Sequence, residues 1–183
     1  DIISNPSVPA EQKIVFCEAE AKRSGYFEFA LADKTGNAYN LTAGKEQANV
    51  SGQEYFQKAM NGKPAASDLF IDEKGRQVIS FAAPVYQNGQ QTGVLIGRKD
   101  GHVLSDIVSS ISYKKTGFAY MVNDQGTAIG DRNDDLVNSR VNYIEAAKTD
   151  SKLKDLSVLM KEKMLKREIG SGDYAYEGND QIV

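Results

Sequence analysis

The sequence predicts an α+β protein built from two similar modules in tandem. Each module is expected to be an antiparallel sheet flanked by helices, and one helix precedes the first module. Three observations predict this fold class. Segments with strand character alternate with segments at helical spacing along the 183 residues. Gly-containing turns separate neighbouring strand segments, which is typical of hairpins. A strand–turn–strand pattern near the start returns in the second half.

A helix is predicted over residues 9–24, where apolar residues recur at helical spacing. Pro9 suits the first turn because it has no amide that needs a partner, and Gly25 ends the helix. Cys17, the only cysteine, lies among the apolar residues of this segment. We interpret it as a small buried residue rather than a reactive thiol.

A hairpin and a short helix follow. The aromatic-rich run 26–32 predicts a strand, Gly36 supplies the positive φ of a turn, and residues 38–42 return as the second strand. Residues 54–61 predict a short helix that Gly62 closes.

Three further strands and a helix complete the first module. The strands are predicted over 66–71, 77–86 and 92–98, with polar Gly-containing turns between them. Pro84 lacks an amide for a sheet ladder, which favours an edge or a strand end at that point. Helical spacing returns over 100–111.

The pattern then begins again. Leu31–Ala38 (LADKTGNA) is similar to Met121–Ala128 (MVNDQGTA), and Gly36 matches Gly126. So short a match also arises by chance, but the same order of helix, Gly, strand, turn and strand surrounds both copies. That shared order favours a duplication.

The second module is predicted to contain a strand over 117–123, helices over 142–148 and 152–166, and a strand over 173–177. A hairpin partner is expected after that strand. Residues 181–183 resemble only the beginning of a strand, so we expect the second module to be incomplete.

Composition limits the functional classes. Net charge is −3 and the pI is about 5.3, so no basic surface for nucleic acid is expected. The Lys-rich run 152–167 contains acidic residues and predicts a solvated helix face. His102, the only histidine, has no Cys or His neighbour at metal-ligand spacing. We expect neither a cofactor nor a metal.

The sequence also argues against an enzyme. A Ser/His/Asp or Cys/His arrangement would have to include His102 or Cys17, and neither lies in a suitable context. No nucleophile elbow, phosphate loop or dinucleotide fingerprint is present. The carboxylate pairs Asp72–Glu73 and Asp134–Asp135 lie in polar, turn-like stretches. An active site made of carboxylates alone stays open as an alternative.

No stretch of about 18 apolar residues predicts a membrane span, and no signal peptide opens the chain. Because the chain starts at Asp1 without an initiator Met, we interpret it as a piece of a longer protein.

Three aromatic residues of the first module lie near polar groups: Tyr55, Phe56 and Phe70. Aromatic walls with a few polar groups are typical of small-molecule sites. The alternative interpretation is ordinary core packing.

The segment Val50–Lys63 resembles the corresponding segment of double Cache (dCACHE) sensor domains. Tyr143–Lys148 is similar to a segment of clostridial-type chemoreceptors. The other segments that resemble the family, in the family's order, are Ala66–Phe70, Val78–Val85, Gly93–Gly97, Thr116–Tyr120 and Gly126–Ile129.

The resemblance implies an extracellular sensor of a bacterial transmembrane receptor, homodimeric in the full-length protein and flanked by transmembrane helices. It implies two PAS-like modules after the end of a long helix at 1–25. The membrane-distal module would span 26–111 and hold the ligand, and the membrane-proximal module would span 112–183.

The amino-acid-binding branch of the family carries an Arg where this chain has Gln53, which cannot grip a carboxylate through its charge. The branch's Trp-Tyr pair is here Tyr55-Phe56, a Tyr is replaced by Ala48, and the strand Tyr is Phe70. Its Asp falls near Arg98, with Asp100 two residues further along the strand. We therefore expect a ligand other than a standard α-amino acid.

Two hypotheses follow from the resemblance. The first is a sensor in which a small molecule binds the distal module. The second is a protein-interaction module on the same fold with a filled pocket. For the first hypothesis the candidate ligand-binding residues are Gln53, Tyr55, Phe56, Phe70, Asp72, Ser80, Arg98 and Asp100.

Overall fold

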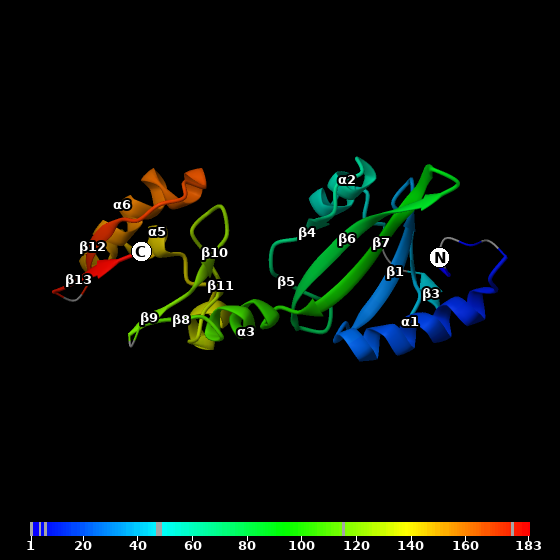
Figure 1. Cartoon of the computed structure of the whole chain (residues 1–183), viewed down its shortest axis with the longest axis horizontal. Helices are drawn as coiled ribbons and strands as arrows, with labels where there is room; N and C mark the ends of the chain where they lie inside the picture. Colours follow the sequence, from blue (N-terminus) through cyan, green and yellow to red (C-terminus); the bar gives the residue numbers. More distant parts are fainter. Residues whose placement is uncertain (1, 4, 6, 47–48, 115, 177) are drawn as a thin grey trace. The chain divides into compact units, whose positions relative to one another are not determined.

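The computed structural model describes the chain except for residues 1, 4, 6, 47–48, 115 and 177. It contains two compact units, Asp1–Gly101 and His102–Val183 (Figure 1). The sequence placed residues 102–111 with the first module. The structure instead assigns them to the second unit, because helix α3 (Val103–Ser109) packs against strand β11 (Ala128–Gly130).

The described residues of the first unit form a seven-stranded sheet in which every pairing is antiparallel. Strand β5 pairs with β6 beside β4, off the end of the main path. The main path is β3 (Lys45–Glu46), β2 (Ala38–Asn40), β1 (Glu28–Asp33), β7 (Gln90–Asp100), β6 (Gln77–Gln87) and β4 (Ala65–Ala66), and β5 spans Phe70–Ile71.

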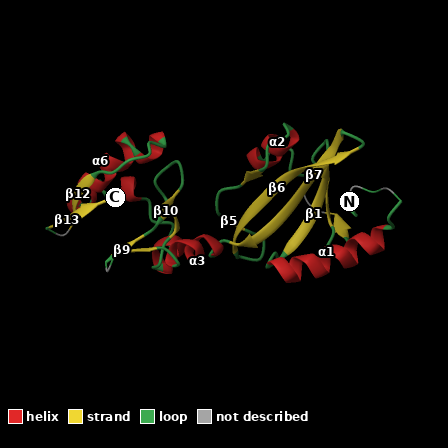
Figure 2. Cartoon of the chain, viewed as in Figure 1, coloured by secondary structure: helices red, strands yellow, loops and turns green. Residues whose placement is uncertain are grey.

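One helix lies on each face of this sheet (Figure 2). Helix α1 (Ala10–Ser24) packs on one face and α2 (Glu54–Met60) on the other. The core between α1 and the sheet consists of Ile3, Cys17, Phe29, Leu31, Leu41 and Leu95. The core between α2 and the sheet consists of Ala30, Ala32, Ala38, Val50, Tyr55, Phe56, Ala59, Ala82, Val94 and Ile96. The alternation along β1 and β7 thus divides the core into two layers.

Helix α1 begins and ends as the sequence predicts. Pro9 occupies the N-cap, and Gly25 follows the helix in the left-handed conformation with φ 70°. Cys17 is buried, as predicted, and burial raises the pKa of its thiol, with a smaller contribution from Glu20.

The predicted strand 66–71 is two short strands, β4 and β5, that contact different parts of β6. Pro84 lies inside β6 opposite Val94. Since β4 pairs with β6 only at Phe81 and Ala82, Pro84 lies beyond the end of that partner, where a missing amide donor is tolerated.

The second unit contains short elements around a core of Val108, Ala128, Val137, Leu156 and Met160. In addition to α3 and β11 its elements are β8 (Ser112–Tyr113), β9 (Gly117–Phe118), β10 (Met121–Val122), α4 (Asp134–Asn138), α5 (Tyr143–Ala146), α6 (Lys154–Glu162), β12 (Asp173–Tyr176) and β13 (Asn179–Ile182), with single 3-10 turns at Ser151–Leu153 and Met164–Lys166.

Two expectations for this unit were wrong. The end of the chain supplies the hairpin partner that seemed to be missing, because β13 pairs with β12 from Asp173–Ile182 to Tyr176–Asn179. Asp134 and Asp135, assigned to a turn, form the first turn of α4, where Asn133 caps the helix by accepting the Asp135 amide.

The repeated sequence motif corresponds to two hairpins with the same turn. The Asp33 and Asn123 side chains each accept the amides two and four residues further along. Asp72 makes the same turn between β5 and β6. The repeated motif is therefore a turn in which an Asp or Asn side chain accepts two backbone amides, and this turn occurs at three places in the chain.

Candidate functional site

A row of polar side chains crosses three neighbouring strands of the first unit. In the sheet register Arg98 on β7 lies opposite Glu28 on β1 and opposite Ser80 on β6. Each of the three lies two residues from a core residue on the same strand (Ala30, Ile96 or Ala82), and side chains two residues apart point to the same face of a sheet. They therefore point to the face that α2 covers. The row continues the apolar core of that face as a polar layer.

Arg98 is held by an ion pair. Its Nη1 lies 3.1 Å from Glu28 Oε1, and the two side chains are 16% and 14% exposed. Asn40 Nδ2 donates a hydrogen bond of 2.9 Å to Glu28 Oε2. The guanidinium carbon lies 5.8 Å from the centre of the Phe70 ring. Glu28 therefore compensates the charge of Arg98 within the sheet face.

Tyr55 joins this row from α2. Burial raises the pKa of its phenol, while the Arg98 cation and hydrogen-bonding contacts with Ser80 and Arg98 act in the opposite direction. Ser80 is fully buried, and its amide is bonded to Ser67 Oγ at 2.9 Å. Within the described residues the Ser80 Oγ itself lacks a partner of good hydrogen-bond distance and angle. The Ser80 hydroxyl is therefore buried beside a phenol and a guanidinium and can still form a further hydrogen bond. We call Glu28, Tyr55, Phe70, Ser80 and Arg98 the α2-side cluster.

Four of the residues predicted from sequence thus lie together: Tyr55, Phe70, Ser80 and Arg98. The other four have different places. Phe56 is 3% exposed and packs in the apolar core. Gln53 is exposed at the N-cap of α2. Ala48 lies outside the described residues.

Asp72 and Asp100 lie elsewhere along the chain's first unit, in a turn and at a strand end. The Asp72 carboxylate is buried in its own turn, where it accepts the Lys74 and Arg76 amides and Arg76 Nε at 2.8–2.9 Å. Asp100 is exposed at the end of β7, on the same side of the strand as Arg98.

Sequence reasoning missed Glu28 and Asn40. Glu28 is a charged residue between two phenylalanines in a strand, which is a detectable signal of a buried polar position. Its partner Arg98 is distant in sequence, and only the pairing of β1 with β7 brings the two together.

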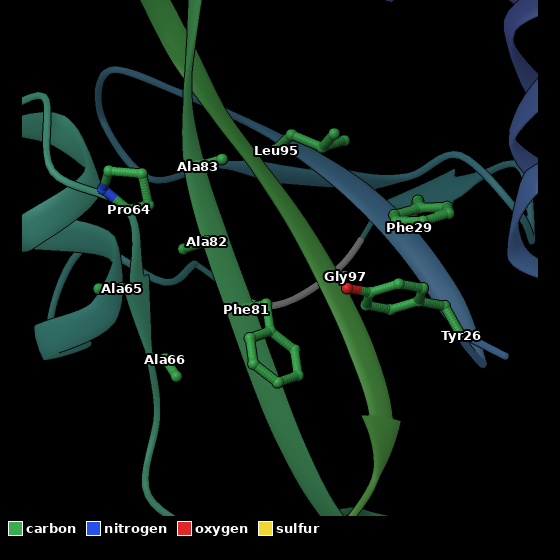
Figure 3. A pocket seen from close by; sticks show the side chains of 10 residues that line it. All are labelled: Tyr26, Phe29, Pro64, Ala65, Ala66, Phe81, Ala82, Ala83, Leu95 and Gly97. Carbon is green, nitrogen blue, oxygen red and sulfur yellow. The ribbon is translucent and has the colours of Figure 1, made fainter. Parts of the chain in front are cut away.

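The opposite face of the sheet carries an aromatic groove of about 380 Å³. Figure 3 shows the rings of Tyr26, Phe29 and Phe81 around Gly97. A Cβ at Gly97 would lie 2.7 Å from the Tyr26 ring, so glycine is what allows this ring to lie against the sheet. The groove is mainly apolar, in contrast to the α2-side cluster.

The α2-side cluster is suited to binding rather than to catalysis. Its cation and anion neutralise each other, and its hydroxyl groups can donate or accept hydrogen bonds. Among the described residues, no group of three or more His, Cys, Asp or Glu could hold a metal ion. None of the described helices is long and apolar enough to cross a membrane.

Comparison with solved structures supports the fold. The sensory domain of the Campylobacter jejuni chemoreceptor Tlp3 with isoleucine bound superposes with a TM-score of 0.67 at 12% identity, over 99% of this chain and 69% of that one. The ligand-binding domain of the Pseudomonas aeruginosa PAO1 amino acid chemoreceptor PctC with GABA gives 0.60 at 18% identity, over 91% and 70%. The extracellular domain of the putative histidine kinase mmHK1S-Z2 gives 0.64 at 14%, over 95% and 75%.

A search of curated proteins gives no significant match. The family model dCache_1, described as a Cache domain, matches residues 1–183. The α+β fold with an N-terminal helix and antiparallel sheets agrees with the predicted class. Because the match covers the whole sequence, the chain belongs to the Cache domain family, a family of sensor domains and not of enzymes.

Proposed function

We propose that the first unit is the membrane-distal sensing module of a bacterial transmembrane receptor, and that a small molecule binds it at the α2-side cluster. The observation that carries this proposal is the buried Ser80 hydroxyl, which has no partner of good geometry and lies beside Tyr55 and the Arg98–Glu28 pair. A ligand with a hydrogen-bonding group would satisfy it.

The energetics support binding rather than a purely structural role. A buried ion pair contributes little net stability, because the desolvation of both charges offsets their attraction. A buried polar group without a partner costs about 1–3 kcal/mol. The cluster is therefore poorly optimised for the stability of the fold, as functional sites often are.

The charges support a ligand without net charge. Glu28 already neutralises Arg98, so neither a free anion nor a free cation gains an unpaired counter-charge there. Gln53 is exposed and supplies no charge for a carboxylate. Tlp3 and PctC are described with isoleucine and GABA, respectively. The positions of this chain support a polar, uncharged ligand instead of a standard α-amino acid.

Within a receptor, binding under α2 would shift the population of two arrangements of the distal module. The second unit, as the membrane-proximal module, would pass that change to flanking transmembrane helices in a homodimer on the extracellular side of the membrane. The relatives described as sensory or extracellular domains support this location.

One observation favours a protein-interaction module as the second candidate. Tyr55 and Phe56 are both buried against the sheet, as a filled pocket requires. The aromatic groove around Tyr26 and Phe81 on the other face would then be the surface for a partner (Figure 3).

A thermal-shift screen followed by calorimetry tests the proposal. The library contains sugars, nucleosides, amides, organic acids, amines and the standard amino acids. We expect a polar uncharged compound to raise the Tm, and Ser80→Ala to weaken its binding at least tenfold. Ser157→Ala, which removes a buried hydroxyl from α6 of the second unit, is the matched control and should leave the affinity unchanged. No stabilising compound, or equal effects of both variants, would count against sensing at this cluster.

A further inference from the structure

The second unit contains an aromatic cavity of about 430 Å³. Its volume falls within the range of about 300–1,000 Å³ that is usual for small-molecule sites. Four tyrosines line it, together with one phenylalanine and two charged residues: Tyr120, Tyr143, Tyr174, Tyr176, Phe118, Asp131 and Arg132. The cavity lies wholly within the second unit and includes no residue of the α2-side cluster.

Asp131 is the polar anchor of this cavity. It is 4% exposed, and its Oδ1 accepts the Asn133 amide at 2.8 Å. Its backbone amide is bonded to Ser105 Oγ. Over the described residues, no Lys, Arg or His forms an ion pair with its carboxylate. The guanidinium of the neighbouring Arg132 lies over the Phe118 ring, 4.5 Å from its centre. Asp131 is thus a nine-tenths buried carboxylate that forms no ion pair with a described residue, in a cavity whose lining cation, Arg132, lies over an aromatic ring. Such a carboxylate favours a cationic ligand.

The tyrosine rings supply the remaining walls. The rings of Tyr120 and Tyr143 are 6.1 Å apart at 60°, so they present two inclined faces. Burial raises the pKa of Tyr143 to about 12, with a further contribution from Asp131. Burial raises the pKa of Tyr120 further still, and Asp131 again contributes. Both phenols are therefore neutral at physiological pH, and the Asp131 charge is close to both rings.

We propose that this cavity is a second binding site, and that it takes a small organic cation such as an alkylammonium or quaternary ammonium compound. Aromatic faces attract cations through their quadrupole, and the attraction is strongest where the cation is desolvated. The position of Arg132 over Phe118 is one such contact among the lining residues. The Asp131 carboxylate attracts a cation and repels an anion, and a neutral analogue of the same shape gains nothing from its charge. This inference is independent of the ligand proposed for the first unit.

Calorimetry of the 183-residue chain with choline tests the proposal. The neutral isostere 3,3-dimethyl-1-butanol has the same shape without the charge. We expect choline to bind at least tenfold more tightly than the isostere, and Asp131→Asn to remove most of that preference. Asn keeps an oxygen for the Asn133 amide, so the loop is preserved. Asp124→Asn, at an exposed turn position, is the matched control and should not change choline binding.

A second pair of variants keeps the test valid should Asp131→Asn fail to fold. Tyr143→Phe retains the ring face and should bind choline within about twofold of the wild-type affinity, whereas Tyr143→Leu should bind it at least fivefold more weakly. Ser80→Ala should leave choline binding unchanged, which separates this site from the cluster in the first unit. Equal binding of choline and its isostere, equal effects of the two Tyr143 variants, or no choline binding would overturn the proposal.

Discussion

At the scale of single residues, the first unit is defined by the contrast between satisfied and unsatisfied polar groups. The Asp72 carboxylate receives three hydrogen bonds inside its own turn, while the Ser80 hydroxyl is equally inaccessible and receives none of good geometry within the described residues. A satisfied buried group stabilises its surroundings, whereas an unsatisfied one destabilises them. This contrast separates a structural carboxylate from a candidate binding group, although the sequence suggested both as ligand contacts.

Ser80→Ala is expected to leave the stability of the first unit unchanged or to raise it by about 1 kcal/mol, because the buried hydroxyl that it removes has no partner of good hydrogen-bond geometry among the described residues. Ser67→Ala should lower stability by about 1 kcal/mol, because Ser67 Oγ accepts the Ser80 amide and donates to Asp68 O. Hydrogen exchange at the β6 amides measures both changes. A loss of stability in Ser80→Ala as large as that in Ser67→Ala would show that the Ser80 hydroxyl makes a full hydrogen bond in the folded protein.

The ion pair between Arg98 and Glu28 predicts non-additive mutations. Glu28→Gln or Arg98→Met alone should each destabilise the first unit by about 3–5 kcal/mol, since each leaves one buried charge without its partner. The double variant removes both charges and should be more stable than either single variant. Hydrogen exchange at β1 and β7 measures this coupling. Losses that simply add would mean that the charges are solvated independently.

The sequence revealed which residue types to expect in the site but not how they combine. Tyr55 and Phe70 could be selected in advance because they are aromatic residues near polar groups in a predicted helix and strand, and Arg98 because the resemblance to the family places a ligand contact near it. Glu28 and Asn40 could not, because their contact with Arg98 depends on the register of β1 against β7 and β2. Register between distant strands is a tertiary property that local spacing does not encode.

At the scale of elements, the shared turn of the hairpins determines where the strands reverse. Gly36 and Gly75 close the turns after Asp33 and Asp72 with φ values of 85° and 75°. Their surroundings differ, however. A Cβ at Gly36 would lie 2.5 Å from the Ser51 amide nitrogen, whereas a Cβ at Gly75 would meet nothing within 4 Å.

This difference predicts a graded effect of alanine. Gly75→Ala should cost about 1 kcal/mol for the left-handed backbone alone. Gly36→Ala should cost at least twice as much, because backbone of the segment before α2 must also move. Thermal unfolding of the two variants provides the comparison. Equal losses would show that the segment around Ser51 yields freely.

The turn at Asp72 also predicts a pH dependence. Burial alone would raise the pKa of Asp72, but hydrogen bonds from Arg76 and the Lys74 amide outweigh it and hold the pKa below its usual value. A lowered folded-state pKa contributes stability above the unfolded value of about 3.9, and this contribution is lost as pH falls through the folded pKa.

Wild type should therefore exceed Asp72→Asn in stability at pH 7, and the difference should shrink below about pH 4. Urea unfolding at pH 7, 4 and 2.5 measures it. A difference that stays constant over this range would contradict the role of the ionised carboxylate.

Helices and long strands were predictable because their periodic patterns are local. The α1 prediction over 9–24 and the strands around β6 and β7 agree with the structure. Short elements were not predictable, since α4 has only one turn and β13 gains its strand character from pairing with β12. Their stability comes from tertiary contacts rather than from propensity.

At the scale of the whole molecule, the chain carries two candidate sites of different chemistry. The α2-side cluster of the first unit is electrically balanced, and the cavity of the second unit combines tyrosine rings with Asp131, a buried carboxylate that forms no ion pair with a described residue. A sensor with both would respond to two classes of compound. The repeated hairpin was weak evidence for a duplication, because the same turn also occurs at Asp72 within the first unit. The position of helix α3 in the second unit depends on packing against β11.

The proposed function places a small molecule at the α2-side cluster of the first unit. A crystal structure of the chain with a compound that raises its Tm, and whose binding Ser80→Ala weakens, tests it most directly. We expect the compound beneath α2, with a polar atom within about 3.2 Å of Ser80 Oγ and a second contact to Arg98 or Tyr55. A compound bound elsewhere, with Ser80 Oγ still unpaired and Tyr55 unmoved, would contradict it.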